Sequence, residues 1–485
     1  LVNFHLRNFS LLYNIILNVL NVLFPLVTAP YVARVLLPEN VGLFNFANTY
    51  AGYFALVAAL GIPTYGVREV AKRRDNKSAL QCLFSEIFTI NVLSTIVVSL
   101  VFILSLYLVG QLRENILFFM VAGIVIYTKP FSIEWFYQGL ESFGFITIRS
   151  LVVKVLCVAT LFLFVQDVHD VLIYLLISVF ATILNQIWNF SVLLKTGIKL
   201  KLKFTGLRQH IRPLLLLFAS AIAISIYTIL DTIMLGFISN YSEVAYYNNA
   251  THISKSFLAI VTSLSIVAMP RLSYYMQNNE WEEINILMKK SFGIVAFLAI
   301  PIAMGIISIA PTFIPLFLGD AFRGAILPLQ IMALVIIAIG FNNLTGVQVL
   351  IGLGHDKLFL YSVLIGTFSN FAMNCCLIPF YGAKGAAIAS VTAEFLILFV
   401  TYYFVKKKTP IHIDGFSDIL KSFVGGILLC ITSFVILRYI QGWGYVIVYV
   451  VLSIFVYLIS QLMLKNNSLL LFKGIIFKKF KKQTV

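Results

Sequence analysis

Long apolar runs follow one another along the whole sequence. A helix needs about 20 consecutive apolar residues to cross the hydrocarbon core of a bilayer. We therefore predict an all-α membrane protein with fourteen spanning helices, at residues 10–33, 41–62, 80–109, 116–137, 145–166, 171–194, 213–236, 244–269, 289–311, 325–351, 358–378, 385–405, 419–438 and 443–464. An even number of spans places both termini on the same side of the membrane.

Composition supports this prediction. The 485 residues are 60% hydrophobic and 11% charged, whereas a soluble chain is about 45–50% apolar and about 25% charged. The net charge of +16 could suggest a nucleic-acid partner, but most Lys and Arg lie in short stretches between apolar runs. Such a distribution is typical of membrane topology rather than of nucleic-acid binding.

The distribution of Lys and Arg also predicts orientation, because cytoplasmic loops are enriched in both. The N-terminus, the even-numbered loops and the C-terminal tail are rich in basic residues. The odd-numbered loops contain only Arg34, Arg113, Arg323, Lys384 and Arg438. We therefore expect both termini to be cytoplasmic.

A weak internal repeat suggests how the spans are grouped. Residues 41–47 (VGLFNFA) and 244–250 (VAYYNNA) share three residues at an offset of 203, and Gly139-Leu140 recurs as Gly352-Leu353 at an offset of 213. Two halves of six helices each would enter the membrane in the same sense. We expect two six-helix lobes in parallel repeat around a central cavity, followed by two C-terminal helices. The predicted parts are an N-lobe at 1–195, a basic cytoplasmic linker at 196–212, a C-lobe at 213–408, two extra spans within 409–464 and a basic cytoplasmic tail at 465–485.

Charged residues inside apolar spans are the candidate functional residues, because such groups usually face a protein interior or a wet cavity. In the second half, Asp231 lies in one span, and His252 and Lys255 lie in the next. His252 and Lys255 are separated by three positions and share a helix face. The three residues could form a structural ion pair that locks two helices, or a gate that changes protonation with His252 as its pH-sensitive member. Glu394 lies in the twelfth predicted span, where ion coupling and a helix-packing hydrogen bond are both open.

The first half contains a second group of candidates. Lys129-Pro130 interrupts the fourth span, and Glu134 follows it. Arg149 lies about one turn, and Lys154 about three turns, into the fifth span. Lys129, Arg149 and Lys154 would make the inner face of this half cationic. Arg149 could instead extend its side chain to the inner interface, whereas Lys154 lies too deep for that to be easy.

Enzymatic chemistry is poorly supported by the sequence. The predicted outer loops are short, which leaves no space for an external catalytic domain. Gly-rich phosphate loops and clusters of His, Cys and carboxylate residues at metal-ligand spacing are absent from the sequence. We predict a protein that is not an enzyme and that has no cofactor.

Several segments resemble the bacterial polysaccharide transporter, or O-antigen flippase, family of the multidrug/oligosaccharidyl-lipid/polysaccharide exporter superfamily. They are PYVARVLLPENVG (30–42), EWFYQGLESFGFITIRSLVVK (134–154), LDTIMLGFIS (230–239), VAYYNNA (244–250) and LIPFYGAKGAAIASVTAE (377–394). One departure is Leu37, because the family usually has glycine at this position before the proline.

The resemblance implies twelve core helices in two lobes around a central cavity, plus two further helices. It implies a flippase of the bacterial inner membrane that moves undecaprenyl-pyrophosphate-linked oligosaccharide repeat units to the outer leaflet by alternating access. The product would serve O-antigen, capsule or exopolysaccharide biosynthesis. Arg149, Lys154 and Lys129 would then bind the pyrophosphate, because guanidinium and ammonium groups both pair with phosphate. Asp231, His252, Lys255, Glu394 and Glu134 would gate the cavity or couple H⁺ or Na⁺.

A cation-coupled multidrug exporter is disfavoured because the first span lacks an embedded acid and the deep charges of the first half are mainly basic. A polysaccharide polymerase would carry a long external loop. A lipid II flippase would share the architecture, and the sequence does not separate it from the first hypothesis. The expected partners are the lipid-linked oligosaccharide, membrane lipids, a polysaccharide polymerase and a chain-length regulator, without nucleic acid.

Overall fold

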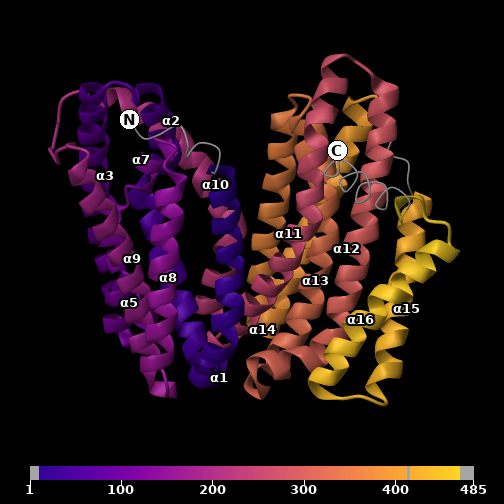
Figure 1. The fold of residues 1–485 in the computed structure, drawn as a ribbon. Helices are drawn as coiled ribbons and strands as arrows, with labels where there is room; N and C mark the ends of the chain where they lie inside the picture. The colour runs from indigo at the N-terminus through magenta and orange to yellow at the C-terminus, as the bar shows by residue number, and fades with distance from the viewer. Residues whose placement is uncertain (1–9, 412–415, 470–485) are drawn as a thin grey trace, which may run out of the picture. The chain divides into compact units, whose positions relative to one another are not determined.

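The computed structural model describes residues 10–411 and 416–469, and the regular elements in these ranges are helical (Figure 1). Ten helices in the described ranges are long and apolar enough to cross a membrane. These findings confirm the all-α membrane prediction. Contacts between residues divide the chain into two compact units, Leu1–Phe237 and Ile238–Val485.

The first unit combines long helices with several short ones. Its elements are α1 (Ser10–Ala59), α2 (Ile62–Arg73), α3 (Lys77–Leu108), α4 (Gly110–Glu114), α5 (Ile116–Ala122), α6 (Ile124–Tyr127), η2 (Lys129–Phe131), α7 (Glu134–Gly139), α8 (Phe143–Phe164), η3 (Val168–Asp170), α9 (Val171–Lys195) and α10 (Arg208–Ile238). The fourth predicted span is therefore a chain of short helices from α5 to α7. Its break at η2 contains Pro130, as the position of the proline predicts.

Helix α1 contains the first two predicted spans, separated by the non-helical residue Leu37. Before this residue, the Tyr31 hydroxyl donates a hydrogen bond to the Val165 carbonyl at 2.6 Å. After it, the Asn40 amide donates to the Val168 carbonyl at 2.6 Å. The end of the first arm of α1 and the beginning of the second arm therefore lie at the same place, where α8 ends and α9 begins. The chain reverses direction at Leu37.

Helix α10 packs with the first unit. Gln111 donates a hydrogen bond to the Gly236 carbonyl at 2.6 Å, and the rings of Phe46 and Phe237 lie 5.1 Å apart. The repeat predicts that the second lobe begins at residue 213, whereas the contacts place the division after Phe237. A repeat in sequence records the order of the spans along the chain, and side-chain packing decides which neighbours each span contacts.

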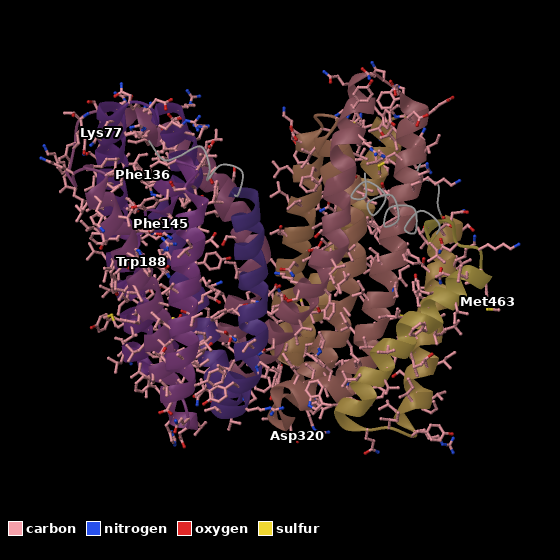
Figure 2. The ribbon with its side chains drawn as sticks, in the orientation of Figure 1. Lys77, Phe136, Phe145, Trp188, Asp320 and Met463 are labelled. Atoms are coloured by element: carbon pink, nitrogen blue, oxygen red, sulfur yellow. The ribbon has the colours of Figure 1, made fainter. Side chains whose placement is uncertain are left out.

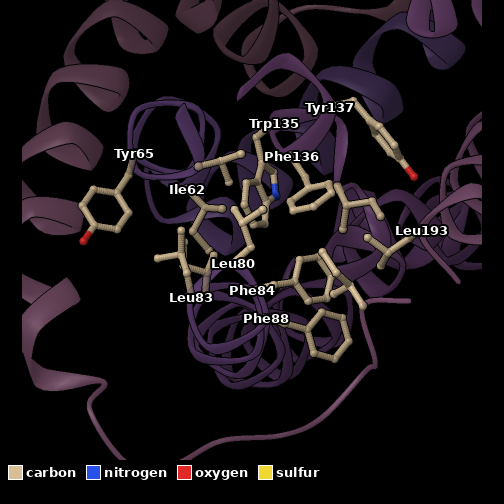
Figure 3. Packing of buried hydrophobic residues seen from close by; sticks show 14 of the residues in the cluster. Ile62, Tyr65, Leu80, Leu83, Phe84, Phe88, Trp135, Phe136, Tyr137 and Leu193 are labelled. Atoms are coloured by element: carbon tan, nitrogen blue, oxygen red, sulfur yellow. The ribbon is translucent and has the colours of Figure 1, made fainter. Parts of the chain in front are cut away.

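A buried apolar cluster consolidates the end of the first unit that contains α2, α7 and the start of α3. Trp135 and Phe136 of α7 pack against Phe84 of α3 at ring-centroid distances of 5.9 and 5.6 Å (Figure 3). A Cβ atom at Gly66 would lie 2.3 Å from the Trp135 ring. Glycine therefore allows α2 to approach α7 closely.

Within residues 238–411 and 416–469, the second unit has eight elements. They are α11 (Tyr241–Gln277), α12 (Trp281–Leu318), η4 (Asp320–Ala325), α13 (Ile326–Asn342), the π-helix η5 (Asn343–Ile351), α14 (Asp356–Lys408), α15 (Phe416–Leu437) and α16 (Gly442–Met463). Helix α14 contains two predicted spans, with a break at Gly382. A Cβ atom at Gly366 would lie 2.3 Å from Ile397, so the two arms of α14 pack against each other.

The last two helices pack onto α12. The Tyr457 hydroxyl donates a hydrogen bond to the Phe297 carbonyl at 2.8 Å, and the Ser308 hydroxyl lies 3.3 Å from the Cys430 sulfur. These contacts make α15 and α16 part of the second unit. Most of the predicted basic tail, residues 470–485, lies outside the described residues.

Candidate functional site

The candidate site of the first unit is centred on Arg149, which lies in the second turn of α8. Its guanidinium is 2% exposed and forms an ion pair with Glu134 of α7 at 3.2 Å. A second guanidinium nitrogen donates a hydrogen bond to the side-chain carbonyl of Asn189 on α9. The Phe145 ring, labelled in Figure 2, lies 5.8 Å from the guanidinium carbon. Three helices therefore meet around one buried cation.

The partners of Arg149 are not equally buried. The Glu134 side chain is 40% exposed, whereas Asn189 is buried. Arg149 Nε is buried without a hydrogen-bond partner among the described residues. A buried cation is tolerated when it is paired and hydrogen-bonded, and loss of one partner is costly. The guanidinium thus has one accessible anionic partner and one unused donor, which suits the exchange of one anion for another.

The other two predicted cations, Lys154 and Lys129, differ in how they are placed relative to Arg149. The Lys154 ammonium lies 5.5 Å from the centre of the Phe24 ring on α1. Five residues advance an α-helix by about 7.5 Å and about 140° around its axis, so Lys154 faces another side of α8. Lys129 is half-buried in η2, and its carbonyl accepts a hydrogen bond from Asn91 at 3.4 Å. The charge of Lys129 also interacts with Glu134, the carboxylate that pairs with Arg149. Arg149 and Lys129 therefore share one acidic neighbour, whereas Lys154 faces another side of α8.

The acidic and basic residues predicted to form a gate belong to different units. Asp231 is buried on α10 in the first unit. His252 and Lys255 are exposed on α11 in the second unit. Their pairing with Asp231 therefore stays a prediction. Glu394 is buried on the second arm of α14, close to the segment that packs against Gly366.

Sequence reasoning missed a polar cluster around Glu86 of α3, a buried residue. One carboxylate oxygen of Glu86 lies 2.7 Å from Lys203, and the other lies 2.9 Å from His210. The second ring nitrogen of His210 lies 2.6 Å from the Tyr65 hydroxyl. The Lys203 ammonium also lies 2.8 Å from the Cys82 sulfur. Its contacts with Cys82 and Glu86 raise the pKa of Lys203 to about 12.

This cluster fixes the predicted linker to the first unit. The backbone N–H and C=O of Lys199 are both hydrogen-bonded at 2.6 Å to the Gln81 side chain. The Lys203 N–H donates to the Thr89 hydroxyl at 2.8 Å. The basic composition of residues 195–212 identified a linker, but it gave no signal that the linker is attached to α3. Among the described residues, no group of three His, Cys, Asp or Glu side chains could hold a metal ion.

Comparison with known proteins agrees with this architecture. Residues 7–276 match the family described as "Polysaccharide biosynthesis protein". A protein of Escherichia coli strain K12 named as an O-antigen transporter is 25% identical over 395 residues, which cover 80% of this chain and 93% of the relative.

Two solved structures show the same fold. The lipid II flippase MurJ, in an inward closed conformation, has a TM-score of 0.72 at 17% identity and covers 93% of this chain and 98% of its own. An inward-facing multidrug transporter of the MATE family has a TM-score of 0.61 at 13% identity, with coverages of 80% and 94%. The family match covers more than half of the chain and confirms the resemblance found in the motifs. The chain therefore belongs to the polysaccharide biosynthesis protein family and is a multi-pass membrane transporter rather than an enzyme.

Proposed function

We propose that this protein is a flippase that moves undecaprenyl-pyrophosphate-linked oligosaccharide repeat units from the cytoplasmic to the outer leaflet of the bacterial inner membrane. In this proposal, fourteen spans form two six-helix lobes and two further helices, and both termini are cytoplasmic. The lobes alternate in access around the substrate. The transported units serve O-antigen, capsule or exopolysaccharide biosynthesis.

The observation that carries the proposal is the buried Arg149 with its half-exposed partner Glu134. A pyrophosphate carries more negative charge than one carboxylate, and arginine binds phosphate oxygens through two parallel hydrogen bonds. The incoming headgroup would displace Glu134 and bind Arg149. The exchange avoids a buried unpaired cation at either stage, a condition that would cost about 3–5 kcal/mol.

The remaining predicted residues have supporting parts in the proposal. Lys129 and Lys154 would contact the headgroup at successive positions along the first unit. Asp231, His252, Lys255 and Glu394 would gate the cavity or couple transport to an H⁺ or Na⁺ gradient, and Glu134 would act as the gate of the headgroup site. A polymerase and a chain-length regulator would receive the exported units.

Export in the source bacterium tests the function. Deletion of the gene should abolish surface polysaccharide, and the parent protein should restore it. Arg149→Ala combined with Lys154→Ala should leave export at background while the protein still inserts, measured by immunoblot of the membrane fraction. Arg113→Ala, which removes an exposed arginine elsewhere in the first unit, is the matched control and should export normally. Full export by the double variant would refute the site assignment. Rescue of a host depleted of its lipid II flippase would instead favour lipid II as the substrate.

Binding of inorganic pyrophosphate separates a headgroup site from a structural ion pair. Glu134→Gln removes the competing charge and keeps the side-chain shape. We expect it to increase the thermal stabilisation that pyrophosphate gives to the purified protein, since a ligand stabilises the state that it binds. Arg149→Ala should abolish this stabilisation, and Arg149→Lys should retain part of it. If Glu134→Gln and the parent respond equally, displacement of Glu134 is wrong.

A further inference from the structure

The linker of the first unit, residues 196–207, runs along the outside of α3 (Figure 1). Its attachment points are Gln81 for Lys199 and Thr89 for Lys203. These two positions on α3 are separated by about 12 Å of helix rise. Four residues of extended chain cover about 13 Å, so the segment from 199 to 203 runs nearly parallel to α3. We call residues 199–204 the strap.

The strap cannot lie in the hydrocarbon core. Among the described residues, the backbone groups of Leu200, Lys201 and Leu202 have no hydrogen-bond partner. An unpaired backbone group in lipid costs several kcal/mol, because no water is present to replace the missing partner. The strap must therefore lie where water or lipid headgroups are available, which places Thr89 at or outside the hydrocarbon boundary.

The exposed surface of α3 places the boundary at the same level. The large apolar side chains that α3 exposes begin at Leu93 and continue to Leu108. Residues Ile90 to Leu108 span about 28 Å of helix, close to the hydrocarbon thickness of about 30 Å. The strap is attached to α3 from Gln81 to Thr89, so its Thr89 end lies in the headgroup layer and its Gln81 end lies further from the hydrocarbon. Lys77, at the start of this part, is labelled at the end of the first unit in Figure 2.

The side chains of the strap match a headgroup layer in both charge and polarity. Lys199 and Lys201 are exposed, and Leu202 and Phe204 are 56% and 65% exposed. Lys77 and Lys195 are exposed close by, and a Cβ atom added at Gly197 would lie 2.7 Å from the Lys77 ammonium. The sequence from 195 to 212 contains no Asp or Glu. Glu86, which faces the strap from α3, is already paired with Lys203 and His210.

We propose that the strap is a binding site for anionic phospholipid, with phosphate groups between Lys199 and Lys201 and with Leu202 and Phe204 against the start of the acyl chains. The free N–H groups of the strap add donors for phosphate oxygens. The attachment to α3 orders the strap before lipid binds, which lowers the entropy cost of binding. This site is distinct from the proposed headgroup site at Arg149.

The test uses the full-length protein in nanodiscs of phosphatidylcholine with increasing phosphatidylglycerol. Lipid retention is measured by native mass spectrometry, and hydrogen exchange is measured on peptides that cover residues 196–207. Each lysine near an anionic surface contributes about fivefold in affinity (about 1 kcal/mol). Lys199→Gln with Lys201→Gln should weaken phosphatidylglycerol retention about 25-fold and remove the lipid-dependent protection. Lys289→Gln with Lys290→Gln removes the same charge from exposed lysines of the second unit and should leave both measurements unchanged.

Three results would overturn the proposal. Unchanged phosphatidylglycerol retention in the Lys199/Lys201 variant would exclude these side chains. An equal loss in the Lys289/Lys290 control would assign binding to net charge. Equal protection by inorganic phosphate in pure phosphatidylcholine would assign the site to free phosphate. Leu202→Ser with Phe204→Ser gives an independent arm that keeps every charge: it should reduce lipid protection of the strap, and an unchanged protection would remove the acyl contact from the proposal.

Discussion

Leu37 occupies a backbone conformation that favours glycine, with φ 63° and ψ 167°. Non-glycine residues in this region cost about 1–3 kcal/mol. The helix reversal in α1 enforces the conformation, because Tyr31 and Asn40 on either side are bonded to Val165 and Val168. The preference of the family for glycine at this position has a direct physical reason: without a Cβ atom, the reversal is free of this strain.

A comparison of alanine and glycine isolates the strain. Leu37→Ala removes the side chain, which is 43% exposed, and keeps the strain, whereas Leu37→Gly removes both. Glycine loses about 0.5–1 kcal/mol through its greater freedom in the unfolded chain. The Leu37→Gly protein should therefore be more stable to unfolding than the Leu37→Ala protein by about 0.5–2 kcal/mol. At Val27, an exposed helical position of the same α1, glycine should be less stable than alanine by about 1 kcal/mol.

The assay is the half-life of monodisperse protein in detergent at a fixed temperature, followed by size-exclusion chromatography. Each 1.4 kcal/mol by which a substitution lowers the activation free energy of unfolding raises the unfolding rate about tenfold. The sign of the glycine–alanine difference should be opposite at positions 37 and 27. The same sign at both positions would refute the strain argument, whatever the size of the effect.

Three further predictions concern contacts that hold segments together within each unit. Gly382→Ala should destabilise the second unit by about 2–4 kcal/mol, measured by the same half-life, because φ is 51° and the new Cβ would lie 2.5 Å from the Glu243 carboxylate. Gly305→Ala, at a helical site with no atom within 4 Å, should not destabilise it. Gln81→Ala should increase tryptic cleavage at Lys199 and Lys201 by roughly 30-fold through loss of two hydrogen bonds, whereas Ser78→Ala should not. The pKa of Lys203 is raised to about 12. Its ion pair with Glu86 therefore stabilises the strap fully at pH values below the ordinary lysine pKa, and this stabilisation is lost only as the pH rises through about 12. The ratio of variant to parent cleavage should therefore stay constant between about pH 7 and 10.

The number and placement of apolar runs predicted most of the helical segments, because spanning a bilayer imposes a length on each run. The sequence did not predict which spans join without a loop. Helices α1 and α14 each contain two predicted spans, and a reversal within one residue depends on backbone angles that apolar periodicity does not record. Pro130 predicted the break in the fourth span, because proline removes a backbone donor.

Charged residues were found by the rule that ions are rare in membrane spans, which identified Arg149 and Glu134 as candidates. Asn189 was missed because it is 40 residues from Arg149 in sequence, and the rotation of α9 about its axis decides whether an amide meets the guanidinium. His210 was missed for the same reason, since its contacts are with Tyr65 and Glu86 on two other helices. Spacing within one helix predicts a shared face, and packing between helices decides what that face contacts.

The positions of the two reversals bear on the internal repeat. Adding the repeat offset of 203 to position 37 gives position 240. Asn240 caps the start of α11, directly after the end of α10. Subtracting the second offset of 213 from position 382 gives position 169, which lies in η3 between α8 and α9. Each reversal that lies inside one helix in one half thus corresponds, in the other half, to a connection between two separate helices. The correspondence is expected if both halves derive from one arrangement of six spans, in which the connection can shorten until two helices become one. The two-lobe repeat stays a prediction, and this correspondence is a structural argument in its favour that residues 41–47 and 244–250 alone could not supply.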